Sequence, residues 1–270
     1  MTNVSPSRWQ VRAVAMAAAQ AGGRAAAASF RRSDLRVEWK SDESPVTRAD
    51  RESEVACQAV IHAAFPDDAW LGEETGESGG GSGRSGRRWI VDPIDGTRNF
   101  VRGIPLWSTL VACEEEDAAG RRVIASAVNL PVLGELYDAV LGGGARCNGA
   151  AIAVSEVASL ADSLFCYETP AWFQRHGLAS VFDRLCHGSA LQRGGGDAFY
   201  HMLVASGRAE LVVEPQLSVW DVAATSLVVS EAGGRFTTLD GGVDIRAGNA
   251  VITNGRVHDE VLTLIRASAG

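Results

Sequence analysis

Positive charge, paired cysteines and long apolar runs are all scarce in this sequence of 270 residues. Its formal net charge of -8 argues against a general binder of nucleic-acid backbones, because such proteins need a basic surface. The five cysteines stand singly, without the Cys-x-x-Cys spacing of zinc or redox sites, and their odd number does not fit a disulfide framework. No run approaches the ~20 apolar residues of a membrane span. We therefore expect a cytoplasmic protein with no nucleic-acid or membrane partner.

The composition that remains is typical of one compact globular unit, with 46% hydrophobic and 21% charged residues. An alanine-rich stretch from Ala13 to Ala28 has the apolar character of a signal peptide, but Arg12, Gln20 and Arg24 interrupt it. Because alanine favours helices, this stretch instead predicts an N-terminal helix over about Arg8 to Ala28.

Helical and strand patterns alternate along the chain, and there is no internal repeat. A second helix follows Asp50, its expected N-cap, and the glycine-rich segment from Thr75 to Arg88 is expected to be a mobile surface loop. Further strands are expected at 89–91, 109–111, 123–124, 136–140, 211–213 and 251–252, and further helices at 198–206, 221–231 and 257–265. The alternation predicts a layered α/β architecture and leaves the strand order open.

The most informative stretch is a buried strand, Trp89-Ile90-Val91, that runs directly into Asp92-Pro93-Ile94-Asp95-Gly96-Thr97. Two carboxylates at a strand end are costly unless a cation neutralises them, and Mg2+ prefers oxygen ligands of this kind. Pro93 is expected to fix a turn, and the N–H groups of Gly96 and Thr97, at the start of a short helix, are expected to face an anion. Taken alone, the motif also fits an Asp-Pro turn followed by a helix cap.

Three other acidic positions have two explanations each. Glu73-Glu74 ends an apolar stretch and is either a solvated pair or part of a site. Asp221 and Asp50 each stand near a helix start, where an N-cap competes with a functional role. The histidines stand in no recognisable catalytic context and are interpreted as structural. They are His62, His176, His187, His201 and His258.

Three motifs together resemble the inositol monophosphatase superfamily, in the same order and over nearly the whole chain. They are Gly72-Glu73-Glu74, the Asp92–Thr97 motif with Asn99-Phe100, and Trp220-Asp221-Val222-Ala223-Ala224 followed by Glu231-Ala232-Gly233-Gly234. The resemblance implies a layered αβαβα sandwich, with an α+β half over residues 1–145 and an α/β half over residues 146–270. It also suggests a homodimer.

The resemblance implies a Mg2+-dependent phosphomonoesterase that binds two or three Mg2+ ions per site and acts on a small-molecule phosphate ester. The implied metal ligands are Glu73, Asp92, the carbonyl group of Ile94, Asp95 and Asp221. Thr97, paired with Asp50, would orient or activate the attacking water beside Glu73. The amides of Gly96 and Thr97 would hold the phosphate, and Glu74 would support Glu73 or the metal's water ligands. Lys40 falls where the family has a mobile loop near the site, and is either part of that loop's function or a solvated lysine.

The candidates for substrate contacts are Asp95, Arg193, Asp197 and Glu214. Glu214 stands seven residues before Asp221, where family members use a carboxylate to contact substrate hydroxyls. A Gly-Asp pair followed by an aromatic residue at Asp197 resembles the histidinol-phosphate phosphatase branch, although an N-cap would also explain Asp197. Added carboxylates would hold a substrate that bears an ammonium group and an imidazole. We therefore predict that L-histidinol phosphate is hydrolysed to L-histidinol and phosphate.

Other functions are compatible with the same metal motifs. The substrate could be inositol 1-phosphate or another cyclitol, sugar or nucleoside monophosphate. A nucleotide bisphosphate phosphatase would need cations for a second phosphate, for which Arg98, Arg102 and Arg193 are the candidates. A non-catalytic binding protein of the same fold would be expected to lack at least one of the acids.

Overall fold

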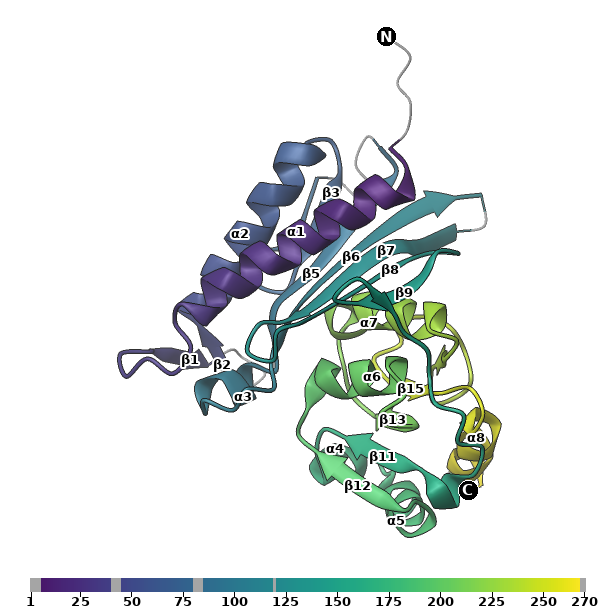
Figure 1. Ribbon diagram of the computed structural model, residues 1–270. Helices are drawn as coiled ribbons and strands as arrows, with labels where there is room; N and C mark the ends of the chain where they lie inside the picture. Colours follow the sequence, from purple (N-terminus) through teal and green to yellow (C-terminus); the bar gives the residue numbers. More distant parts are fainter. Residues whose placement is uncertain (1–5, 40–44, 80–84, 119, 268–270) are drawn as a thin grey trace.

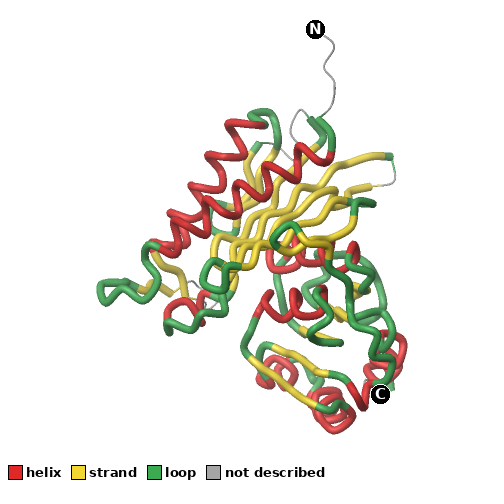
Figure 2. Tube along the Cα trace, viewed as in Figure 1, coloured by secondary structure: helices red, strands yellow, loops and turns green. Residues whose placement is uncertain are grey.

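Two β-sheets and the helices around them build the molecule in five layers (Figure 1). A computed structural model describes residues 6–39, 45–79, 85–118 and 120–267. Viewed by secondary structure, helices and strands alternate from α1 and α2 at one side to α5 and α8 at the other (Figure 2). This arrangement confirms the layered αβαβα architecture predicted from the sequence.

The first sheet has eight strands in the order β10-β9-β8-β7-β6-β5-β3-β4. Its neighbours pair antiparallel, except that β3 and β5 run parallel. A short β1-β2 ribbon lies beside it. These strands are β1 (Val37–Trp39), β2 (Pro45–Thr47), β3 (Ala69–Gly72), β4 (Gly76–Ser78), β5 (Arg87–Asp95), β6 (Ser108–Asp117), β7 (Gly120–Leu130), β8 (Glu135–Val140), β9 (Gly144–Cys147) and β10 (Ala150–Ala151).

Helices α1 (Arg8–Ala27) and α2 (Arg48–Ala64) cover one face of this sheet (Figure 1). α1 begins at a capping box in which Ser7 and Gln10 bond each other's backbone, and its buried side is made mostly of alanine and glycine. Small side chains let α1 lie close to both α2 and the sheet. Thr47 caps α2, and Asp50 is the third residue of the helix, where its side chain completes the capping box, so the expectation of Asp50 as the N-cap is wrong.

The second sheet has five strands in the order β12-β11-β13-β15-β14. β12, β11 and β13 run parallel, and β15 pairs antiparallel with β13 and β14. The strands are β11 (Leu164–Tyr167), β12 (Leu191–Gly194), β13 (Leu211–Glu214), β14 (Arg235–Thr237) and β15 (Ala250–Thr253). The remaining helices are α3 (Thr97–Val101), a 3-10 turn (Leu160–Asp162), α4 (Pro170–Arg175), α5 (Ala179–Gly188), α6 (Asp197–Ala205), α7 (Val219–Glu231) and α8 (His258–Arg266).

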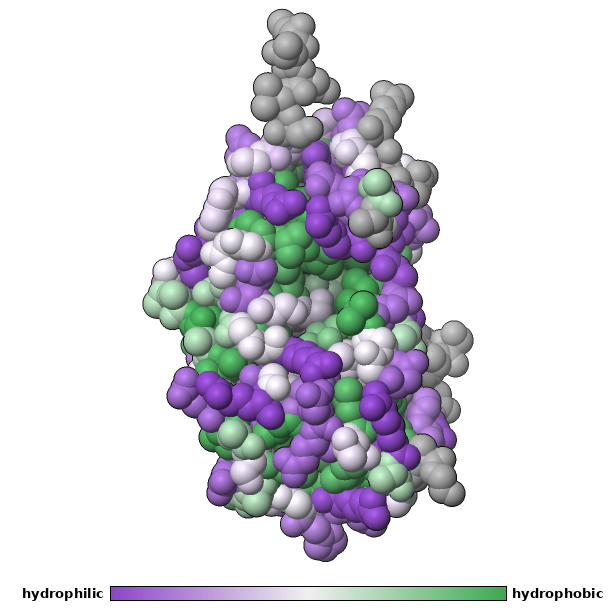
Figure 3. Space-filling view, turned by 90° about the vertical axis from the view of Figure 1, so that its right-hand side faces the viewer, coloured by the Kyte–Doolittle hydropathy of each residue, from purple (hydrophilic) through white to green (hydrophobic). Residues whose placement is uncertain are grey.

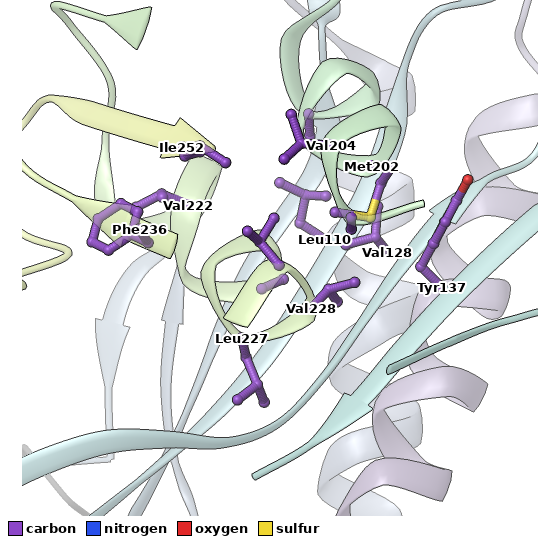
Figure 4. Close-up of a cluster of buried hydrophobic side chains, with 14 of the residues drawn as sticks. Leu110, Val128, Tyr137, Met202, Val204, Val222, Leu227, Val228, Phe236 and Ile252 are labelled. Carbon is purple, nitrogen blue, oxygen red and sulfur yellow. The ribbon is translucent and has the colours of Figure 1, made fainter. Parts of the chain in front are cut away.

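Helices α6 and α7 lie between the two sheets and form the largest hydrophobic core (Figure 4). Val222 and Val228 of α7 and Met202 of α6 are fully buried there, against Leu110 and Tyr137 of the first sheet. Because α7 contacts both sheets, the residue at its start is held rigidly between them.

The predicted elements appear close to their expected bounds, with a few differences. α7 begins at Val219, two residues before the expected start. The boundary expected at 145 falls inside β9, and the first sheet continues to Ala151; the division into two halves stays a prediction. Within the expected loop from Thr75 to Arg88, residues 76–78 form β4, and residues 80–84 lie outside the described residues. Lys40 also lies outside them.

The surface is mixed in polarity. On the face shown in Figure 3, hydrophilic residues predominate and hydrophobic residues gather in a hollow near mid-height. Among the described residues, no helix combines the length and the apolar character needed to cross a membrane.

A buried histidine in the second half predicts how stability depends on pH. The His258 ring lies between the hydroxyls of Thr237 and Thr253, at 3.0 and 2.9 Å, and burial lowers its pKa to about 4. Its pKa in the unfolded chain is about 6.5, so the unfolded chain binds more protons between pH 6.5 and 4. The stability from the neutral ring is therefore present above pH 6.5 and is lost as the pH falls toward 4.

We expect the free energy of unfolding of His258→Gln, which cannot titrate, to fall less than that of the unsubstituted protein as the pH falls from 7.5 to 4.5. Urea unfolding at several pH values measures this. The exposed His62, replaced by glutamine, is the matched control. Parallel curves for His258→Gln and the unsubstituted protein would contradict the assignment.

Candidate active site

The acidic motif lies on β5 at a bulge, and β5 continues through it to Asp95. Alternating strand residues face opposite sides, so Asp92 and Asp95, three apart, would normally point away from each other. The register shifts between these residues, and a bulge of this kind turns both carboxylates to one side. Pro93 stands within the bulge, where its carbonyl accepts hydrogen bonds from Ser53 and Thr109 at 3.0 and 2.9 Å. The sequence predicted that Pro93 fixes a turn. This prediction is wrong, because Pro93 lies within β5.

Asp221 joins these two acids from the start of α7. Carboxylate oxygens of Asp92, Asp95 and Asp221 all lie within 4.8 Å of one another. Asp221 Oδ2 also accepts a hydrogen bond from Ser218 N–H at 2.6 Å, so the residue is both part of a helix cap and part of the acidic cluster. The cap contact therefore does not exclude a functional role for Asp221, which stays a prediction.

The electrostatics of this cluster fit a divalent cation. Burial raises the pKa of Asp92 and of Asp95 well above the usual range, and the neighbouring carboxylates raise it further. Burial raises the pKa of Asp221 to about 7. Asp92 Oδ1 is buried and accepts no hydrogen bond from any described residue. An all-oxygen set with an unused acceptor suits Mg2+, which prefers carboxylate oxygens.

Glu73 follows β3, which runs parallel to β5 and ends beside it. Its N–H donates to Val91 at 3.1 Å, and its carboxylate lies close enough to Asp92 to raise the pKa of that group. The turn after Glu73 is held by Glu54, a buried acid of α2 that accepts hydrogen bonds from the N–H groups of Glu74 and Thr75 at 2.8 and 3.0 Å. Glu54 had no role in the sequence prediction, since a single glutamate inside a helix carries no signal for this contact.

Asp50 and Thr97 meet, as the sequence predicts. Thr97 Oγ1 lies 3.3 Å from Asp50 Oδ1 and 2.9 Å from the carbonyl oxygen of Ile94. The other oxygen of Asp50 accepts from the N–H and the hydroxyl of Thr47, both at 2.7 Å. Burial, opposed by those hydrogen bonds, raises the pKa of Asp50 to about 6.

Gly96 allows a close approach next to these residues. It adopts φ 82°, in the left-handed region, and caps the short helix α3. A Cβ atom there would lie 2.9 Å from Asp197 Oδ2 and 3.0 Å from the carbonyl oxygen of Leu106, so the position requires glycine. Gly96 and Thr97 both line a cavity of about 230 Å³, as does Glu73.

Of the candidate substrate contacts, Asp197 lies next to Gly96. Asp197 begins α6 and lines the cavity, and Asn99 Nδ2 donates a hydrogen bond to Asp197 Oδ2 at 3.1 Å. Asp197 adopts φ 44°, a strained conformation for a residue that is not glycine, and such strain gathers at functional sites. A smaller adjoining cavity is lined by Asp95, Asp197, Glu214 and Asp221, so these four acids share one space.

Arg193 does not join them. It is exposed on β12, its Nη1 donates to the carbonyl of its neighbour Gln192 at 2.7 Å, and it lines neither cavity. The cations that do line the cavity of about 230 Å³ are Arg98 and Arg175.

Several lining residues were missed from the sequence or given another role. Glu168 directly follows β11 and Trp172 lies within α4, and neither stands in a motif recognised from the sequence. Gln216 lies near Glu214 without a recognisable signal. His201, interpreted as structural, also lines the smaller cavity: its Nε2 lies 3.3 Å from Glu214 Oε1, and its Nδ1 lies 3.0 Å from the hydroxyl of Thr225.

Known proteins share this fold. The model of the Inositol monophosphatase family matches residues 8–269. The chain belongs to the inositol monophosphatase family. Relatives in this family include the histidinol-phosphatases of Streptomyces coelicolor, 40% identical over 86% of this chain and 88% of that protein, and of Mycobacterium tuberculosis, 42% identical over 87% and 89%.

A crystal structure of the extragenic suppressor protein suhB from Bartonella henselae has a TM-score of 0.88 and 30% identity, and the match covers 95% of this chain and 98% of that one. Family membership makes this chain a phosphatase, and the cluster of Asp92, Asp95 and Asp221 agrees with phosphate-ester hydrolysis.

Proposed function

We propose that this phosphatase hydrolyses L-histidinol phosphate to L-histidinol and phosphate, with Mg2+ as its cofactor. The observation that carries the proposal is the acidic lining that continues past the metal cluster into the substrate cavity, through Asp197 and Glu214. The two histidinol-phosphatase relatives, at 40% and 42% identity, support the same substrate.

Glu73, Asp92, Asp95, Asp221 and the carbonyl of Ile94 would hold the Mg2+ ions. When bound, Mg2+ neutralises these acids, polarises the phosphoryl group and stabilises the leaving alkoxide. The chain's own contribution is rigidity: the bulge of β5 fixes the first two aspartates, and the cap of α7 fixes Asp221. Ligands that are already in place do not have to be ordered at each turnover.

Thr97 and Asp50 would handle the proton of the attacking water. Thr97 Oγ1 can accept a hydrogen bond from water while it shares its own hydrogen with Asp50 Oδ1 at 3.3 Å. Asp50, whose pKa is raised to about 6 by burial, stays mostly ionised at neutral pH and can take up that proton. Gly96 and Thr97 line the cavity, and their N–H groups would bind the phosphate there.

The leaving alcohol would lie against Asp197 and Glu214. Buried carboxylates bind a cationic group through charge-assisted hydrogen bonds, and they bind a neutral polyol more weakly. Histidinol carries an ammonium group and a titratable imidazole, so its phosphate ester matches this lining better than inositol 1-phosphate does.

Steady-state turnover of four esters tests the substrate. They are L-histidinol phosphate, inositol 1-phosphate, adenosine 3′,5′-bisphosphate and adenosine monophosphate, each with Mg2+. We expect kcat/KM for L-histidinol phosphate to exceed the others by at least ~10-fold, which corresponds to about 1.4 kcal/mol of transition-state discrimination. Equal turnover of the four esters, or a preference for inositol 1-phosphate, would refute the proposed substrate while leaving the phosphatase assignment intact.

A further inference from the structure

Three acids that line the two adjoining cavities stand at the carboxyl ends of three neighbouring parallel strands. Glu214 is the last residue of β13, Glu168 directly follows β11, and Asp197 comes three residues after the end of β12. The carboxyl ends of parallel strands meet at one edge of a sheet, which is where α/β proteins bind their ligands. Two of these acids have a proposed role, and Glu168 has none.

The strand register brings Glu168 level with Glu214. Cys166 of β11 pairs with Val212 of β13, so two residues further along, Glu168 stands beside Glu214. On its other side, Tyr167 pairs with Gly194 of β12, and the chain then turns into α6 at Asp197. The central strand of the three therefore ends in a carboxylate between the two candidate substrate contacts.

Glu168 belongs to the substrate side of the cavity and not to the metal cluster. Burial is the main cause of its raised pKa, and Glu214 is the main neighbouring carboxylate that adds to the effect. Asp197, in contrast, is influenced by Asp95 and Asp221 as well as by Glu168. The acids thus form a continuous path from the metal cluster through Asp197 and Glu214 to Glu168 at its outer end.

One oxygen of Glu168 has no partner. Its Oε2 atom is buried and receives no hydrogen bond from any described residue, although the residue lines the cavity of about 230 Å³. Trp172, one turn further along, lines both this cavity and the adjoining one, and its indole gives a flat apolar wall. Arg98 and Arg175 also line the cavity, and Arg98 lowers the pKa of Glu168 without filling the free acceptor.

A buried acceptor without a donor is costly, and a bound ligand that carries an N–H group would remove that cost. Three carboxylates at one sheet edge favour a positively charged donor, and a tryptophan beside them favours a planar or cationic group. The imidazole and the ammonium group of histidinol have these properties, whereas the hydroxyls of a neutral polyol lack the charge.

We propose that Glu168 is a specificity-determining residue, whose free Oε2 accepts a hydrogen bond from a charged N–H group of the leaving alcohol, with Trp172 packed against that alcohol. The inference rests on the proposed function and extends it, because it assigns a third carboxylate and an aromatic wall to the recognition of a cationic alcohol.

Glu168→Gln in the full-length, Mg2+-loaded enzyme tests this, because glutamine keeps the size and one acceptor but removes the charge. We expect KM for L-histidinol phosphate to rise by ~10-fold or more, the usual effect of losing a charge-assisted hydrogen bond, with kcat changed less. Titration calorimetry should show weaker binding of the product L-histidinol by a similar factor. kcat/KM for inositol 1-phosphate should stay within about twofold, since that ester carries no cation.

The matched control is Glu156→Gln, which removes the charge of a glutamate in the same half whose side chain is 90% exposed. Glu156→Gln should change kcat/KM for neither L-histidinol phosphate nor inositol 1-phosphate. If Glu168→Gln lost kcat/KM equally for L-histidinol phosphate and inositol 1-phosphate, the residue would have a structural role. If kcat/KM changed for neither ester, Glu168 would not select the substrate. Either result would overturn the inference.

The test of Glu168 can be distinguished from the test of L-histidinol phosphate as the substrate. If the unsubstituted enzyme does not prefer L-histidinol phosphate, the proposed function fails, and the comparison is made between phosphoethanolamine, a cationic ester, and glycerol 2-phosphate, a neutral one. A selective loss on phosphoethanolamine in Glu168→Gln would still support a cation-binding role for Glu168. Equal effects on the two esters would overturn it.

Discussion

Replacing Asp92 with asparagine is expected to lower kcat/KM for the preferred ester by roughly 1,000-fold or more. A bound metal ion contributes several kcal/mol to transition-state stabilisation, and each ~1.4 kcal/mol corresponds to a factor of ten in rate. Asp92 lies fully inside the acidic cluster, with a free Oδ1 atom that no described residue satisfies. Phosphate release at saturating Mg2+ measures the effect, with Asp183→Asn, on the exposed side of α5, as the matched control.

The same substitution should not destabilise the metal-free protein. Burial raises the pKa of Asp221 to about 7, above its value of about 3.8 in the unfolded chain, so the stability linked to its protonated form is fully present at low pH and lost as the pH rises through about 7. The carboxylates of Glu73, Asp95 and Asp221 raise the pKa of Asp92, and a neutral asparagine at this position removes that repulsion. We expect the metal-free Asp92→Asn protein to melt at or above the temperature of the unsubstituted protein at pH 8, and to gain less from Mg2+. A large loss of stability would indicate misfolding as the cause of inactivity.

Replacing Thr97 with valine is expected to lower kcat by about 100-fold, the lower range for loss of general acid–base catalysis. Valine keeps the shape and removes the hydroxyl that lies 3.3 Å from Asp50 Oδ1. The substitution leaves the four carboxylates in place, and among the assigned metal ligands it affects only the Ile94 carbonyl, which loses its hydrogen bond from Thr97 Oγ1. Most of the stabilisation by Mg2+ should therefore be retained, which distinguishes this variant from Asp92→Asn.

Thr97→Ser is the matched control, because serine restores the hydroxyl and should recover most of the activity. If Thr97→Val retained more than half of the turnover rate, the hydroxyl would have no part in handling the proton. If serine failed to restore activity, the methyl group and not the hydroxyl would be the important feature.

The acids assigned to the metal could be recognised from the sequence because they lie in short, contiguous motifs, and their role as ligands stays a prediction. Asp92 and Asp95 are three residues apart, and the structure brings Asp221 to them, as the resemblance implied. The bulge that makes this possible was not predicted, since a register shift depends on the partner strand β6 and not on the motif alone. For the same reason Pro93 was expected in a turn and is found within a strand.

The substrate side was predicted only in part because it depends on strand order. Glu168 becomes a neighbour of Glu214 through the pairing of β11 with β13, and these strands are separated in sequence by β12 and α6. A pattern of apolar residues gives the strands but not their neighbours. Arg193, next to the recognised Gly-Asp pair, seemed well placed, yet β12 is an edge strand and its side chain lies at the surface.

Asp50 and Asp221 were each expected to be either a helix cap or a functional residue. Each is the third residue of its helix and completes a capping box, so one carboxylate oxygen accepts a hydrogen bond from a backbone N–H while the other is left for a second contact. An aspartate has two oxygens, and the two roles are compatible.

The central claim is that the four acids Glu73, Asp92, Asp95 and Asp221 hold Mg2+ for the hydrolysis of a phosphate ester. The most direct measurement is phosphate release from L-histidinol phosphate by protein stripped of metal with a chelator, before and after Mg2+ is restored. We expect no release above the uncatalysed background without metal, and recovery that saturates with Mg2+. Full activity in the stripped protein would contradict the account.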